Sequence, residues 1–243
     1  RDSTASRGLG DVYKRQPAKL PLLKKMTEQV GVIKKELPFN GTKIINGTMD
    51  AWIGILGSGG FENKKNIYLS GTSEILGINS KEVIPTPGII IFPEDENIKL
   101  HAGPTQSGGA SKLWFCNLFN LTPLEMNKLV ENENFNDVSP IFLPHLQGER
   151  APLWNPNLKG IFYGMNSKTN KGNLARSVYE GVSFSAKLIL ESLEKSSNCI
   201  NKEINCGGGG FQADIWNQIR ANILNKKINR LSIKDPGILG SVG

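Results

Sequence analysis

The sequence feature that most restricts the fold is an apolar repeat between about Asn170 and Leu193. Apolar residues recur there every four positions, which is the spacing of one face of an α-helix. The repeat consists of Leu174, Val178, Val182, Ala186 and Leu190. Most of the stability of such a helix comes from packing its apolar face against other elements. We therefore expect a long helix with one buried stripe in a layered core.

Shorter strand and helix signals alternate along the rest of the chain. Residues 66–70 and 73–79 read as two strands of a hairpin joined through Gly71 and Thr72. Other strands are predicted at 43–45, 88–93, 98–101 and a segment ending at Cys206, and other helices at 51–56, 109–118, 123–130 and 215–224. Thr122 is the expected N-cap of the helix at 123–130. Strands interleaved with helices indicate an α/β layered domain.

Composition is that of a globular protein and narrows the classes of partner. The chain has 243 residues, of which 38% are hydrophobic and 21% charged. Its apolar runs reach only a handful of residues, whereas a membrane helix needs roughly 20, and the N-terminus has no apolar signal core. We therefore expect no membrane partner and a cytoplasmic location, which also suits three cysteines without a ligand-like spacing.

The formal net charge of +7 makes nucleic acid an alternative partner to consider. The lysines occur in ones and twos, as at Lys24 and Lys25, and no aromatic stripe is interleaved with them. We interpret the basic charge as a solvated surface and expect no nucleic acid partner.

Two short motifs point to phosphoryl transfer. Gly47-Thr48-Met49-Asp50 places a carboxylate after a predicted strand, and Gly71-Thr72-Ser73 follows about twenty residues later. A carboxylate in such a place can accept the proton of a sugar hydroxyl, and small residues in a turn let backbone amides approach a phosphate closely. Taken alone, an aspartate beside a glycine more often caps a helix or forms a turn than acts as a base.

Two further motifs extend the pattern. Residues 144–152 read Pro-His-Leu-Gln-Gly-Glu-Arg-Ala-Pro, and a glycine cluster at 207–210 precedes Trp216 and Gln218. With these four elements in this order the chain resembles the C-terminal domains of the FGGY carbohydrate kinases. The resemblance covers about Leu20 to Gly243.

The resemblance implies a role for each residue that matches a family motif. Asp50 would be the catalytic base, taking the proton of the hydroxyl that attacks the γ-phosphate of ATP. The nucleotide-binding residues would be Gly71 and Thr72 at the phosphates, Gly109 at a helix N-terminus that favours anions, Gly208 and Gly209 against the adenosine, and Gln212. A plain helix-start glycine is the alternative for Gly109, and Asp214 is the alternative to Gln212.

Three more residues are expected to support the site without taking part in the chemistry. Ser73 would support the Gly71–Thr72 turn. Glu149 and Arg150 would form an internal ion pair that fixes their loop.

The fold that the resemblance implies is the actin, hexokinase and Hsp70-like (ribonuclease H-like) ATPase domain, a mixed sheet flanked by helices. Residues 1–16 resemble nothing later in the chain and are expected to be a non-native or disordered leader. Residues 17–243 would be the C-terminal kinase domain, cut short at its end and without the N-terminal sugar-binding domain. ATP and Mg²⁺ are the implied cofactors, with the magnesium ligands expected mainly on the missing domain and no metal ligand assigned in this chain.

The implied function is ATP-dependent phosphorylation of a pentulose such as xylulose, or of a related ketose or polyol, by a xylulokinase-like transferase. The chain alone is expected to be inactive, its partners are expected to be the sugar and ATP, and a homodimer is compatible with the resemblance. The alternative from another class is a non-catalytic actin- or Hsp70-like nucleotide-binding module. Asp50 and the Gly-Glu-Arg loop count against that alternative, since such a module needs no base for a sugar hydroxyl.

Overall fold

A computed structural model of the chain describes Leu22 and residues 24–59, 64–92, 99–231 and 236–240. The chain forms two compact units, Arg1–Met49 and Asp50–Gly243. In the described part of the first unit, strands β1 (Gln29–Val32) and β2 (Lys43–Ile45) pair antiparallel, so the strand predicted at 43–45 is confirmed. The leader predicted at residues 1–16 lies outside the described residues.

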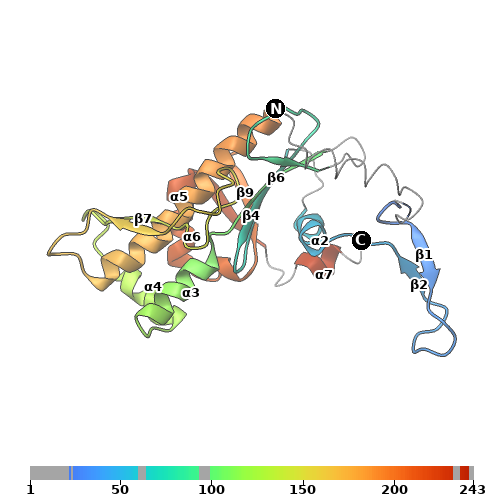
Figure 1. Ribbon diagram of the computed structural model, residues 1–243, viewed down its shortest axis with the longest axis horizontal. Helices are drawn as coiled ribbons and strands as arrows, with labels where there is room; N and C mark the ends of the chain where they lie inside the picture. The colour runs from blue at the N-terminus through green and yellow to red at the C-terminus, as the bar shows by residue number, and fades with distance from the viewer. Residues whose placement is uncertain (1–21, 23, 60–63, 93–98, 232–235, 241–243) are drawn as a thin grey trace, which may run out of the picture. The chain divides into compact units, whose positions relative to one another are not determined.

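The second unit is built on a six-stranded sheet (Figure 1). The strand order is β10 (Lys227–Arg230), β9 (Glu203–Gly207), β3 (Asn66–Ser70), β4 (Glu74–Ser80), β6 (Lys99–Thr105) and β5 (Ile90–Ile91). β9 runs parallel to both β10 and β3, whereas β4 is antiparallel to β3 and β6. The sheet is therefore mixed, as predicted, and the hairpin of β3 and β4 is confirmed.

Helices pack against this sheet and against one another. The helices are α2 (Asp50–Gly57), α3 (Gly109–Leu118), α4 (Pro123–Glu131), α5 (Lys171–Ser197), α6 (Asp214–Leu224) and α7 (Pro236–Gly240), with a short 3-10 helix η2 (Gly209–Phe211) before α6. α3 has the predicted bounds. At α4 the predicted cap is present, because Thr122 and Glu125 form a capping box. The mixed sheet with flanking helices confirms the predicted actin- and hexokinase-like fold class.

The long helix α5 joins the two halves of the core. Asn170 caps its first turn, accepting a hydrogen bond from Asn173 N at 2.8 Å. Val178 and Val182, in its first half, belong to an apolar cluster with side chains of α3, α4 and α6. Its second half packs on the sheet through Ala186, Ile189, Leu190 and Leu193. The four-residue repeat therefore predicted the helix correctly, but one stripe serves two clusters.

The hairpin of β7 (Ile141–Leu143) and β8 (Ile161–Tyr163) was not predicted, because each strand has only three residues. It packs on α5, where Gly181 permits the approach: a Cβ there would lie 2.2 Å from Phe142 O. The connection between β7 and β8 contains the Gly-Glu-Arg sequence.

Two other features of the described chain bear on earlier predictions. Strand β5 is shorter than the segment predicted at 88–93, and β6 continues to Thr105, beyond the predicted residue 101. Within the described ranges, no helix has the length and apolar content to cross a membrane.

Candidate functional site

A cleft of about 490 Å³ lies where three predicted motifs meet. Its walls come from the β3–β4 turn, the first turns of α3 and α4, and the segment from η2 into α6. Five residues predicted to bind nucleotide line it together: Gly71, Thr72, Gly109, Gly209 and Gln212. These residues come from three separate stretches of the sequence, so the cleft depends on tertiary packing rather than on any single loop.

The β3–β4 turn is exposed and is held against the start of α3. Gly109 N donates to Gly71 O at 3.0 Å, and Ala110 N donates to Thr72 O at 2.9 Å. A Cβ on Gly109 would lie 2.5 Å from Gly71 O, so only glycine fits there. The turn therefore already accepts the hydrogen bonds of these first two helix amides, and the predicted contact of Gly109 with a nucleotide stays a prediction. Gly109 acts by letting the turn and the helix come close.

Ser73, predicted to support this turn, does so through its backbone. Its carbonyl accepts a hydrogen bond from Gly71 N at 2.9 Å, which closes the turn. Its side chain is exposed and does not line the cleft.

The glycines at 208–210 have different reasons to be glycine. Gly208 has φ +92°, and a Cβ on it would lie 2.4 Å from Ser70 O. A Cβ on Gly210 would lie 1.9 Å from Ser70 Oγ, so both residues pack against the end of β3. Gly209 and Gly210 both line the cleft, but of these glycines only Gly209 has no atom within 4 Å of its Cβ position apart from its chain neighbours. Only at Gly209 does the glycine leave open space in which a ligand can approach the backbone.

Of the two polar side chains predicted after this turn, one faces the cleft. Gln212 lines it, whereas Asp214 begins α6 and lies 3.3 Å from Arg230 Nη1 of β10. The structure therefore favours Gln212 over Asp214 as a ligand contact.

Lys112 is a cleft residue that the sequence reasoning missed. Its ammonium donates to Asn127 Oδ1 at 3.1 Å and lies 5.6 Å from the centre of the Tyr179 ring. Burial lowers the pKa of Lys112. A half-buried cation in contact with neutral groups is well placed to receive an acceptor on a ligand. The signal in the sequence was its position one helical turn after Gly109.

Trp216, which follows the glycine cluster in the sequence, is buried in the core and is also part of the cleft wall. Its ring is 1% exposed and stacks on the Tyr179 ring at 4.4 Å between centroids and 6° between planes. Its indole NH donates to Tyr179 O at 3.2 Å. The ring gives the cleft a rigid apolar wall.

Glu149 is buried beside the cleft and organises the loop before α3. Its carboxylate accepts hydrogen bonds from Thr105 Oγ1 at 2.8 Å, from Ser107 Oγ at 2.7 Å and from Gln106 N at 2.7 Å. Burial by itself would raise the pKa of Glu149, but hydrogen bonds from His145, Ser107 and the Gln106 amide lower it to about 2. The carboxylate therefore stays ionised and fixes the segment that leads to Gly108 and Gly109.

The ion pair predicted between Glu149 and Arg150 is wrong. The Arg150 guanidinium donates instead to Thr105 O at 2.7 Å, and Glu149 accepts from the backbone NH of Arg150 at 2.8 Å. His145 Nδ1 lies 3.2 Å from Glu149 Oε2. Glu149 and Arg150 both hold the loop by hydrogen bonds to Thr105 at the end of β6, and not by bonding to each other.

For Asp50, the structure describes the backbone, which begins α2, and not the side chain. Its assignment as the catalytic base therefore stays a prediction. Among the described residues, no group of three His, Cys, Asp or Glu side chains is placed to hold a metal ion.

Comparison with known proteins connects this geometry to one family. Residues 67–243 match the model of the FGGY family of carbohydrate kinases, C-terminal domain. A xylulose kinase of Lactococcus lactis is 27% identical over 232 residues, covering 90% of this chain and 46% of the relative. A gluconokinase of Bacillus licheniformis is 25% identical over 201 residues, covering 77% of this chain and 39% of the relative.

The similarity extends to solved structures. The crystal structure of ligand-bound xylulose kinase from Lactobacillus acidophilus superposes with a TM-score of 0.88 at 28% identity, over 97% of this chain and 50% of that one. The chain thus spans about half the length of the proteins it matches.

Proposed function

The chain belongs to the FGGY family of carbohydrate kinases, and from this premise we propose that it forms the nucleotide-binding half of a sugar kinase. The whole enzyme would transfer the γ-phosphoryl group of ATP to a hydroxyl of a small sugar or polyol. The observation that carries the proposal is the meeting of Gly71, Thr72, Gly109, Gly209 and Gln212 in one cleft of about 490 Å³. A cleft of this volume is in the range of small-molecule sites.

In this proposal each wall of the cleft has a separate task. The exposed turn at Gly71 and Thr72 holds the phosphates with its backbone and a hydroxyl. The backbone at Gly209 lies against the adenosine, and Gln212 and Lys112 supply polar contacts. The Trp216 ring gives the adenine of ATP an apolar wall.

Asp50 is the base in this scheme. It would accept the proton of the attacking hydroxyl, while the phosphate turn stabilises the charge on the transferring group. Bound Mg²⁺ would neutralise charge on the β- and γ-phosphates. We assign it no ligand among the described residues, where no ligand cluster occurs.

We further propose that residues 17–243 act as the C-terminal domain and that the main sugar contacts lie on a segment outside this chain. The chain spans 46% of the Lactococcus lactis xylulose kinase, which supports this division. Xylulose is the first substrate to test because that relative and the Lactobacillus acidophilus structure are xylulose kinases, and gluconate is the second.

Nucleotide binding is tested most cleanly by filling the open space at Gly209. In Gly209→Leu the new side chain meets no protein atom within 4 Å of its Cβ, so folding should be unaffected while the cleft is blocked. We expect isothermal titration calorimetry with ATP to show at least a hundredfold weaker binding than in the unsubstituted chain. Exposed Leu188→Ala on α5 is the control. Equal ATP affinity in Gly209→Leu would refute this nucleotide site.

The role of Asp50 as the catalytic base is tested in a two-domain protein that contains this chain and the proposed sugar-binding domain. Asp50→Asn should remove nearly all phosphorylation of xylulose, at least a thousandfold in kcat, with ATP affinity unchanged. Substantial turnover in Asp50→Asn would exclude Asp50 as the base. ATP binding by the unsubstituted two-domain protein, without transfer to any sugar, would instead favour the non-catalytic module.

A further inference from the structure

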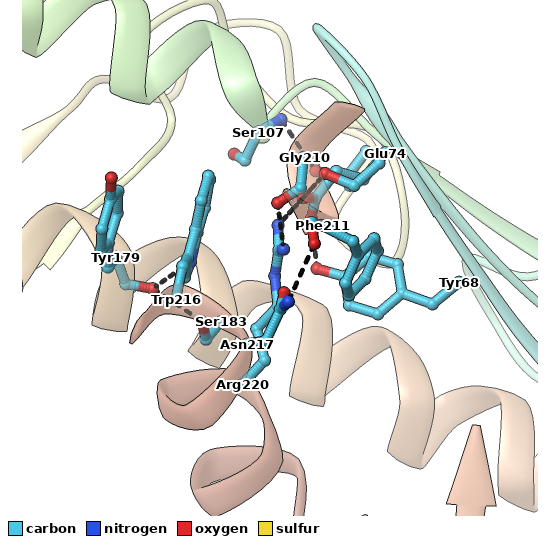
Figure 2. Close-up of polar contacts among 12 residues, drawn as sticks. Tyr68, Glu74, Ser107, Tyr179, Ser183, Gly210, Phe211, Trp216, Asn217 and Arg220 are labelled. Atoms are coloured by element: carbon cyan, nitrogen blue, oxygen red, sulfur yellow. Dashed lines mark hydrogen bonds and ion pairs between the residues drawn. The ribbon is translucent and has the colours of Figure 1, made fainter. Parts of the chain in front are cut away.

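Two charged residues far apart in sequence are buried together behind the cleft. Arg220 of α6 and Glu74, the first residue of β4, both have side chains with no exposed surface. Arg220 Nη2 lies 2.6 Å from Glu74 Oε1 (Figure 2). Neither residue lines the cleft.

The Arg220 side chain reaches the glycine turn at 208–210. Its Nη1 donates to Gly210 O at 2.7 Å, and its Nη2 also donates to Ser70 Oγ at 3.1 Å. The guanidinium lies 3.9 Å from the centre of the Trp216 ring and 4.3 Å from that of Phe211. Figure 2 shows the guanidinium between the Trp216 ring and the Phe211 ring, with its end towards Glu74. Hydrogen bonds and stacking together leave the guanidinium a single position.

Glu74 is connected to the other two turns. It is the residue after Ser73, so its backbone continues directly from the Gly71–Ser73 turn. A Cβ on Gly108 would lie 2.8 Å from Glu74 Cγ, which means that the start of α3 packs on the carboxylate arm. The carboxylate also accepts hydrogen bonds from Tyr68 OH at 2.5 Å and Ser70 Oγ at 2.6 Å.

Tyr68 is held as a neutral donor in this network. Burial, and next the charge of Glu74, raise the pKa of its hydroxyl well above the ordinary value. The carboxylate therefore has an arginine and two hydroxyl groups as hydrogen-bond donors.

Stability alone does not account for such a pair. Replacing a buried ion pair by apolar residues of similar volume is often neutral or stabilising, because both charges lose their hydration on burial. What the pair does supply is a fixed geometry, since Arg220 bonds to Gly210 O while Glu74 follows the Gly71–Ser73 turn and packs against Gly108. The Gly71–Ser73 turn, the Gly108–Gly109 start of α3 and the Gly208–Gly210 turn all meet it.

We propose that the Arg220–Glu74 pair is a positioning device that holds the three glycine turns at the spacing a nucleotide requires. The proposal rests on the proposed function for the identity of the ligand, but the rigidity of the turns is a property of the free chain. Arg220 and Glu74 act through Gly210 and through the Gly71–Ser73 turn, and neither contacts the ligand.

The first test replaces both charges at once. In the double variant Glu74→Leu with Arg220→Met, thermal unfolding should occur within a few degrees of the unsubstituted chain. Hydrogen exchange of the free chain should then be at least tenfold faster at residues 208–212 and 71–73. ADP binding by calorimetry should be about tenfold weaker. Exchange and affinity equal to those of the unsubstituted chain would overturn the proposal.

A second variant keeps the charge in case the double variant does not fold. Arg220→Lys retains a cation opposite Glu74, but one ammonium cannot reproduce the fork that joins Glu74, Ser70 and Gly210. We expect faster exchange at residues 208–212 with little change in unfolding temperature. Unchanged exchange in Arg220→Lys would equally overturn the proposal.

The matched control is the pair of Lys226 and Glu194, which are 2.5 Å apart and away from the cleft. The double variant Lys226→Met with Glu194→Leu should leave hydrogen exchange in the three turns and ADP affinity unaltered. Faster hydrogen exchange of the turns in this control would count against a specific role for Arg220. Failure of the proposed function has a different signature. It would appear as no nucleotide binding by the unsubstituted chain, whatever the exchange rates of the turns.

Discussion

Two buried carboxylates support the cleft from two regions, and they are compensated differently. Glu74, behind the glycine turns, has an arginine partner at 2.6 Å that comes from a distant helix. Glu149, in the connection between β7 and β8, has an arginine next to it in sequence but is held by hydroxyl and amide donors. The neighbouring residues Glu149 and Arg150 therefore form no ion pair, whereas the packing of α6 brings Arg220 to Glu74 and forms one.

The difference has a structural reason. Arg150 directs its guanidinium to Thr105 O, whereas its backbone NH faces Glu149. Glu74 and Arg220 project from separate elements into one interior space, where an unpaired charge is costly.

The largest effect is expected from breaking the Arg220–Glu74 pair at one end. Glu74→Gln leaves Arg220 buried without its counter-charge and should lower the free energy of unfolding by about 3–5 kcal/mol. Urea denaturation at neutral pH measures this. Glu203→Gln, which removes an exposed partner of Lys227, is the control and should change little. If the two variants were equally stable, the burial of the Glu74 charge would have no energetic consequence.

An intermediate effect is expected at Glu149. Glu149→Gln keeps the shape of the side chain but weakens hydrogen bonds to a charged acceptor, and should cost about 2 kcal/mol at neutral pH. The effect depends on pH because the pKa of Glu149 is lowered from 4.5 to about 2.

Because the pKa of Glu149 is lower in the folded chain, the stabilisation by its carboxylate is lost as the pH falls. Above about pH 4.5 the unfolded and folded chains both carry the ionised group, and its full stabilisation is present. As the pH falls from 4.5 towards 2, the unfolded chain binds the proton first and the stabilisation is lost. The stability difference between the unsubstituted chain and Glu149→Gln should therefore shrink over that range in urea titrations. A constant difference would contradict the lowered pKa.

The smallest effect is expected at Arg150. Arg150→Met loses one hydrogen bond to Thr105 O and should cost about 1 kcal/mol. In double-mutant cycles, Glu149 and Arg150 should show coupling below about 0.5 kcal/mol, whereas Glu74 and Arg220 should show about 2–3 kcal/mol. Strong coupling between Glu149 and Arg150 would restore the ion pair that the sequence suggested.

Much of the fold was predictable from local pattern. The four-residue repeat identified α5, Thr122 identified the start of α4, and Gly71 with Thr72 identified the β3–β4 hairpin. Short strands were predicted unevenly: β2 was predicted, whereas β7 and β10 were missed, since three or four residues carry little periodicity to distinguish a strand from a loop.

The candidate site was predictable only in part. The family resemblance indicated Gly71, Thr72, Gly109 and Gly209, and at the three glycines the absence of a side chain lets the backbone approach a ligand or another chain segment. Lys112 was missed, since a lysine on a helix is ordinarily a solvated residue and only the packing of α3 beside α4 and α5 made it half-buried.

The sequence alone determined the α/β layering and the motifs that supply the cleft, because these depend on local spacing and residue type, and the motifs identified the family, whose resemblance implied the mixed sheet. Only the tertiary structure decided which glycine faces open space and which ones meet Ser70, and which arginine neutralises a buried carboxylate. Those outcomes depend on distances between segments that are remote along the chain. A buried carboxylate loses its hydration only after the segments have packed, and only then does the identity of its partner affect stability.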